Sequence, residues 1–179
     1  MLLLGAILVG LLVGWARGGS LLRLATLELR WPWLLGLSLL GQLALFSLPP
    51  VAAALGDGYR WLYLGSYLPV LLFLGLNRSL PAWGLLCLGV GSNLLVITLN
   101  GGLMPTLRPG TGPGVGAVVR NTAPITDQTL LPFLGDVLLL PLPTGPLAFS
   151  LGDVLIALGV CLLVQRAMCR RRRWRRVVS

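Results

Sequence analysis

Long apolar stretches separated by short polar connections run through most of the chain. A helix needs about 20 apolar residues to cross a bilayer, and four stretches approach that length after a shorter one at the start. The stretches cover residues 2–16, 31–48, 59–76, 81–99 and 146–168. The pattern predicts an all-α integral membrane protein with five transmembrane helices in a single polytopic domain, residues 1–168.

The first stretch, residues 2–16, has the length of a secretory signal core. A signal carries basic residues before its apolar core, whereas Arg17 and Arg23 follow this one. We therefore expect a retained first helix.

The composition supports a lipid environment and excludes several kinds of catalytic and metal site. Hydrophobic residues make up 56% of the chain and charged residues only 11%, against about a quarter in soluble domains, and the mean hydropathy is +0.88. The absence of histidine excludes a histidine general base, haem ligand or zinc ligand. Cys87, Cys161 and Cys169 form no CxxC pair, so we expect neither a disulfide framework nor a bound metal or cofactor.

The arginines predict the orientation of the spans. Eleven of the fourteen lie in the connections after the first and third stretches or at the C-terminal end, and the positive-inside rule places that side in the cytoplasm. We expect an N-out, C-in protein of the bacterial cytoplasmic (inner) membrane. Residues 169–179 then form a basic cytoplasmic tail, expected to contact anionic lipid headgroups rather than nucleic acid. Its arginines are Arg170, Arg171, Arg172, Arg173, Arg175 and Arg176.

The outer loop, residues 100–145, is too long for an ordinary connection. Loops beyond about 12 to 15 residues are usually functional or disordered, yet residues 130–142 are strongly apolar. Thirteen residues are too few to cross a bilayer as a helix. The loop is therefore predicted to contain a short re-entrant or interfacial segment.

The polar residues of the predicted spans lie in their outer halves. Asp153 is the strongest candidate ligand-binding residue, because ionisable groups inside a membrane usually face the bundle interior or a water-filled cavity. It is expected about two turns below the outer surface. Asn93 and Asn100, seven residues apart, share a helix face, and with Gln42 and Tyr67 they would line an outward-open cleft. The alternative is that these groups form hydrogen bonds between helices.

A short internal repeat adds a second carboxylate. The sequence Leu-Gly-Asp-Val occurs at residues 134–137 and 151–154, with Asp136 and Asp153 in equivalent positions. Each aspartate would lie in the first turn of a helix, where a carboxylate interacts favourably with the helix dipole. Alternatively, the two carboxylates meet at the same outer rim.

Small residues recur every four positions in the first stretch, at Ala6, Gly10 and Gly14. This spacing allows close packing against another helix. The neighbour is either a helix of the same chain or a second copy in a homo-oligomer.

Three motifs resemble one family of proteins. They are Asn-Gly-Gly-Leu-Met-Pro at residues 100–105, Leu-Gly-Asp at 134–136 before a Leu- and Pro-rich stretch, and Leu-Gly-Asp at 151–153, at the start of the last helix. Together they resemble a family of bacterial multi-span membrane proteins classed as a domain of unknown function, over nearly the whole chain. The resemblance implies the topology but no reaction.

Three classes of function follow from these features. The first is an accessory or structural subunit that packs against a partner protein in a membrane complex, and small size favours it. The second is an outward-facing binder or transporter of a lipid or small amphiphile, with its cleft in the outer leaflet. The third is a membrane enzyme that acts on a lipid-linked substrate, for which the aspartates of the outer side would have to supply acid and base.

Overall fold

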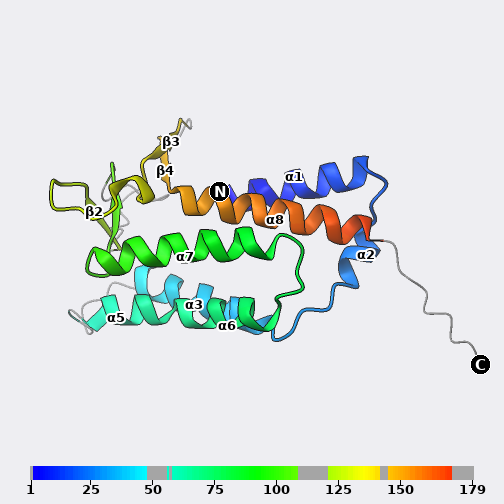
Figure 1. Ribbon diagram of the computed structural model, residues 1–179, viewed down its shortest axis with the longest axis horizontal. Coiled ribbons are helices and arrows are strands. Elements are labelled where there is room, and N and C mark those ends of the chain that lie inside the picture. Colours follow the sequence, from blue (N-terminus) through cyan, green and yellow to red (C-terminus); the bar gives the residue numbers. More distant parts are fainter. Residues whose placement is uncertain (1, 48–55, 57, 109–120, 142–144, 171–179) are drawn as a thin grey trace, which may run out of the picture.

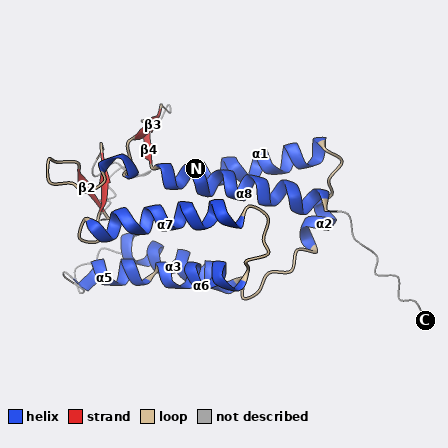
Figure 2. Ribbon diagram, viewed as in Figure 1, coloured by secondary structure: helices blue, strands red, loops and turns tan. Residues whose placement is uncertain are grey.

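The computed structural model describes residues 2–47, 56, 58–108, 121–141 and 145–170. The protein is mostly helical, and its longer helices lie side by side along the long axis (Figures 1 and 2). The helices are α1 (Leu2–Ala16), α2 (Leu21–Ala25), α3 (Trp33–Ser47), α5 (Gly58–Gly65), α6 (Tyr67–Leu76), α7 (Trp83–Leu99) and α8 (Leu151–Cys169), with a 3-10 turn, η1 (Pro132–Leu134). The strands are β1 (Met104–Thr106), β2 (Thr122–Pro124), β3 (Leu138–Leu140) and β4 (Leu147–Phe149).

Each predicted apolar stretch contains a helix, but the expected fifth span begins later than predicted. Residues 147–149 form β4, and α8 starts only at Leu151. The N-cap of α8 is Ser150, whose hydroxyl satisfies a free N–H of the first turn. Among the described residues, α8 is the one helix long and apolar enough to cross a membrane, by length and composition alone. The helices α1, α3 and α7 are apolar and shorter.

The outer loop contains strands, so the all-α prediction is wrong at this point. The strands β1 and β2 pair in parallel, with Met104 opposite Thr122, and β3 and β4 pair in an antiparallel hairpin, with Leu138 opposite Phe149. A further bridge joins Thr106 to Asp136. Prolines interrupt the apolar run of this loop and disfavour a helix there, and the leucines of β3 pair with β4 instead.

A break divides the third predicted span into α5 and α6 at Ser66. Pro69, three residues later, has no N–H to donate to the preceding turn, so the helix cannot continue undistorted. The hydroxyl of Ser38 on α3 donates a 2.6 Å hydrogen bond to the Ser66 carbonyl. The break near Pro69 is thus bonded to the neighbouring helix.

Glycines bring α8 close to both of its neighbours, α1 and α7. A Cβ on Gly10 would lie 2.9 Å from the Cys161 carbonyl oxygen of α8. A Cβ on Gly89 of α7 would lie 2.6 Å from the carbonyl oxygen of Gly152. The small-residue spacing of α1 therefore serves packing within the chain, as one of the two interpretations predicted.

The two ends of the bundle differ in character (Figure 1). At one end, here called the strand end, the strands lie beside the C-terminus of α7 and the start of α8. At the opposite end, here called the arginine end, lie α2, the end of α8 and the α6–α7 connection. The described arginines of the arginine end are Arg17, Arg23, Arg30, Arg78, Arg166 and Arg170.

Candidate functional site

A closed set of hydrogen bonds surrounds Asp153 at the start of α8. The backbone N–H of Asp153 donates to Ser150 Oγ at 3.0 Å, and the backbone N–H of Ser150 donates to Asp153 Oδ2 at 3.1 Å. This reciprocal pair is a capping box, which satisfies two free N–H groups of the helix N-terminus. Asp153 therefore lies in the first turn of α8, as one of the two interpretations of the Leu-Gly-Asp-Val repeat predicted.

Asn93 of α7 completes the set from the neighbouring helix. Its Nδ2 donates to Asp153 Oδ1 at 2.9 Å, and its Oδ1 accepts from the fully buried hydroxyl of Ser150 at 2.8 Å. The contact requires Gly152, because a Cβ there would overlap the Asn93 side chain. The structure thus brings Asn93 and Asp153 together, and the bonds between them join two helices.

Two tyrosines extend the polar region across α5 and α6. The hydroxyl groups of Tyr63 and Tyr67 lie 3.4 Å apart, with their rings edge to face at 5.7 Å. Both hydroxyls lie close enough to Asp136 and Asp153 for electrostatic interaction. Tyr67 therefore lies in the same polar region as Asp153.

Asp136 is held in this region by its backbone. Its N–H donates to the Pro105 carbonyl at 2.8 Å, and its own carbonyl accepts from Leu107 at 3.2 Å. It follows the 3-10 turn η1 and is not in the first turn of a helix, in contrast to Asp153. Burial, and to a smaller extent the charge of Asp153, raise the pKa of Asp136 to about 7. The two carboxylates of the repeat therefore lie near enough to interact, a point that the sequence left open.

Asn100 and Gln42 lie apart from this set. Asn100 follows α7 and binds the loop, since its Nδ2 donates to the Leu130 carbonyl at 2.9 Å and its Oδ1 accepts from the Leu130 N–H at 3.0 Å. Asn100 thus positions the loop rather than lining a cleft with Asn93. Gln42 is partly buried on α3 and takes no part in the hydrogen bonds around Asp153.

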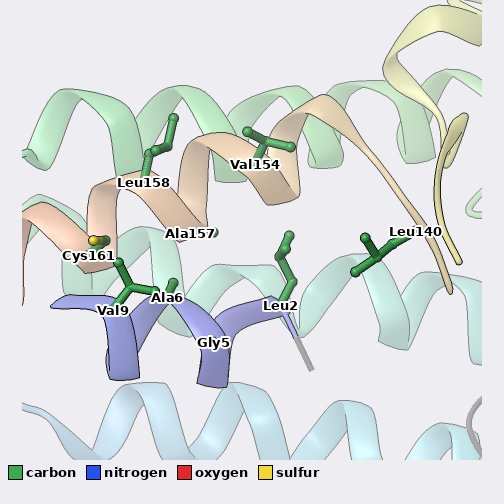
Figure 3. Close-up of a pocket in the computed structure, with 9 residues that line it drawn as sticks. All are labelled: Leu2, Gly5, Ala6, Val9, Leu140, Val154, Ala157, Leu158 and Cys161. Atoms are coloured by element: carbon green, nitrogen blue, oxygen red, sulfur yellow. The ribbon is translucent and has the colours of Figure 1, made fainter. Parts of the chain in front are cut away.

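Two adjoining cavities lie along the first half of α8 and share Leu2 and Ala157. The larger, of about 530 Å³, is apolar and lies between α1 and α8, and Figure 3 shows Leu140 near one end and Cys161 near the other. The smaller, of about 360 Å³, is lined by Asp153 together with α1, β4 and α8. We call the two cavities together the α1–α8 groove. The lining residues of the larger cavity are Leu2, Gly5, Ala6, Val9, Leu140, Val154, Ala157, Leu158 and Cys161.

Sequence reasoning missed the groove and missed Ser150. A signal for Ser150 was present, because Ser-x-x-Asp before an apolar run is a capping-box pattern. The groove had no comparable signal, because it depends on how α1 and β3 meet α8. Within the described ranges, no group of three or more acidic or cysteine residues is placed to hold a metal ion.

These features define a small, mostly helical protein with a polar cluster at the capped start of its last helix. A family of unknown function (DUF5317) matches residues 26–165. The chain belongs to this family, in agreement with the resemblance seen in its motifs. No curated protein and no solved structure is detectably similar to it.

Proposed function

We propose that this protein is a five-span integral protein of the bacterial cytoplasmic membrane that binds a lipid or small amphiphile in its outer half. The observation that carries the proposal is the α1–α8 groove, which is apolar along α1 and reaches the carboxylate of Asp153. Apolar walls with few polar groups are typical of ligand pockets. A groove at the bilayer-facing side of a bundle is accessible to molecules dissolved in lipid.

The outward-facing side chains support a membrane location. Several leucines of α1 and α3 are 60% or more exposed, among them Leu4, Leu12 and Leu39. Soluble monomers rarely expose continuous apolar surfaces of this kind, whereas a bilayer covers them without cost. The described arginines gather mainly at the arginine end, which the positive-inside rule assigns to the cytoplasm. The strand end, with the polar cluster, then faces outward.

The other arginines of the proposed tail, residues 171–176, lie outside the described residues. Arg170 follows α8 directly and is exposed. We retain the proposal that this tail contacts anionic headgroups. The accessory-subunit hypothesis, with a protein partner or a second copy, also stays a prediction, and no observed surface favours a particular partner.

Membrane topology is tested by labelling single cysteines in intact spheroplasts, after replacement of Cys87, Cys161 and Cys169. Gln128→Cys lies at the strand end and Ser79→Cys at the arginine end, and both positions are exposed. We expect a membrane-impermeant maleimide to label Gln128→Cys at once and Ser79→Cys only after lysis. Labelling in the reverse order would contradict the orientation, and labelling of both before lysis would contradict the span arrangement.

Ligand binding is tested by extracting the protein in polymer-bounded lipid discs and identifying bound molecules by native mass spectrometry. Gly5 lines the groove, and Gly5→Leu would fill part of it. The control is Gly36→Leu, on an exposed face of α3 with no atom within 4 Å of a new Cβ. We expect one lipid or amphiphile to remain with the wild type and the control but not with Gly5→Leu. If a second protein stayed bound at a fixed ratio, and the wild type and Gly5→Leu retained the same lipids, the accessory-subunit hypothesis would be favoured instead.

A further inference from the structure

We propose that the ligand of the α1–α8 groove is a long-chain amine, an amphiphile with one ammonium group as its only charge. This inference deepens the proposed function and rests on it. The alkyl chain would lie in the larger cavity between α1 and α8, and the ammonium group would contact Asp153 in the smaller one.

The lining of the larger cavity suits an alkyl chain. Its walls are aliphatic side chains, glycine and alanine, with the Cys161 thiol at the end away from Leu140 (Figure 3). A volume of about 530 Å³ falls within the range of small-molecule sites. Small residues on both helices, such as Gly5 and Ala157, create the space that larger side chains would fill. An alkyl chain bound in the larger cavity would remove its apolar walls from contact with water.

The described hydrogen bonds of the Asp153 carboxylate all come from neutral donors. Each of its oxygens accepts from a neutral donor, the Asn93 amide or the Ser150 backbone N–H. In the part of the chain that the structure describes, no charged side chain donates a hydrogen bond to Asp153. The capping box and the helix dipole stabilise this carboxylate, and a cation in the cavity beside it would gain a charge-assisted hydrogen bond. Ionised carboxylates have about four lone-pair sites, so Asp153 can accept a further bond from an ammonium group.

The charge of Asp153 distinguishes between kinds of ammonium ligand. Among the described residues that line the two cavities, Asp153 is the one charged residue. The phosphate of a phospholipid, even one with an ammonium head, would be brought beside this carboxylate and repelled. A long-chain amine carries no phosphate for Asp153 to repel. The charges therefore favour a long-chain amine over phosphatidylethanolamine.

The inference is tested with three probes that share a sixteen-carbon chain bearing a diazirine and differ in the head: an amine, an alcohol and a carboxylic acid. The protein is reconstituted in phosphatidylcholine discs at pH 7 and irradiated, and the labelled peptides are mapped by mass spectrometry. We expect the amine to label residues 2–9 and 154–161 about tenfold more than the alcohol, the size of effect that a charge-assisted hydrogen bond provides. The acid should label least.

Two variants separate the charge of Asp153 from its structural role. Asp153→Asn removes the charge, and we expect it to reduce amine labelling to the level of the alcohol. Ser150→Ala removes the hydroxyl of the capping box but leaves the charge, so the amine preference should persist. An equal loss of preference in both variants would overturn the inference, because a disturbed helix start would then explain it.

The outcomes also separate this inference from the proposed function. Equal labelling of the groove by all three probes would overturn the amine preference while leaving a lipid-binding groove. If the groove were labelled no more strongly than α3, both the amine preference and the proposed lipid-binding groove would be overturned. Finally, replacement of a third of the phosphatidylcholine by phosphatidylethanolamine should leave amine labelling unchanged, and strong competition would assign the site to a phospholipid head instead.

Discussion

The side-chain amide of Asn93 donates a 2.9 Å hydrogen bond to Asp153 Oδ1, which joins the interior of α7 to the first turn of α8. The bond lies where Gly89 and Gly152 bring the two backbones into close approach. It therefore fixes the position of α7 against α8 and, at the same time, orients the carboxylate that lines the groove. Helix packing and the candidate site depend on the same few atoms.

Replacement of Asn93 should destabilise the protein strongly. In Asn93→Ala the buried Ser150 hydroxyl loses its acceptor and Asp153 Oδ1 loses its donor, and unsatisfied buried groups cost about 1–3 kcal/mol. We expect a decrease of that size in the free energy of unfolding, measured by titration with denaturing detergent. The control is Ser92→Ala, whose hydroxyl bonds only to Gly89 of its own helix. Equal effects of the two substitutions would argue against the role of Asn93.

Close approach of α7 and α8 predicts opposite effects at two glycines of α7. A Cβ at Gly89 would lie 2.6 Å from the Gly152 carbonyl oxygen and 2.9 Å from the Ile156 backbone nitrogen. Because backbone atoms cannot move aside easily, Gly89→Ala should cost about 1–3 kcal/mol. Gly91 has no atom within 4 Å of a new Cβ, so Gly91→Ala should stabilise the helix by up to about 1 kcal/mol. Thermal unfolding in detergent measures both, and destabilisation by Gly91→Ala would contradict the packing described.

The helices could be predicted from the sequence because apolar runs longer than about ten residues favour helices over strands. Their ends were less predictable. The fifth apolar stretch begins at Pro146, but the chain first forms β4, and Ser150 sets the true start of α8. The start of α8 depends on a side-chain hydrogen bond of Ser150, and a hydropathy pattern does not reveal such a bond.

The candidate site could be predicted only in part, for a similar reason. The position of each residue along its apolar stretch led to the expectation that Asn93, Tyr67 and Asp153 share one region, and a hydrogen bond joins Asn93 to Asp153. That position did not show that Asn100 binds the loop, nor that Asp136 lies near enough to Asp153 for their charges to interact. Those placements depend on the pairing of β1 with the η1 region, through contacts such as Thr106 with Asp136, which involve residues 30 positions apart.

Asn100 should control the order of the outer loop with little effect on global stability. Its amide binds both backbone groups of Leu130, so Asn100→Ala releases that segment from the end of α7. We expect at least about tenfold faster amide hydrogen exchange at Leu130, the effect of losing a bond worth about 1.4 kcal/mol. Thr98→Val is the matched control, since the Thr98 hydroxyl bonds only within α7. Unchanged exchange at Leu130 would mean that the loop is held by other contacts.

Asp136 should make the stability of the protein depend on pH. Burial and the Asp153 charge raise its folded-state pKa to about 7, whereas in an unfolded chain the pKa of an aspartate is about 4. Between about pH 4 and pH 7 the folded protein therefore holds a proton that the unfolded chain has released. Its contribution to stability is greatest at the acidic end of this window, falls as the pH rises, and levels off above about pH 7.

The substitution Asp136→Asn isolates this contribution, because the backbone hydrogen bonds of residue 136 to β1 do not need the carboxylate. We expect the wild type to unfold at lower denaturing-detergent concentration at pH 8 than at pH 5. The variant should show a smaller difference and exceed the wild type at pH 8, since it no longer carries a buried charge beside Asp153. Asp127→Asn, at an exposed position of the same loop, should retain the wild-type dependence. If Asp136→Asn retained it as well, the titrating group would lie elsewhere in the molecule.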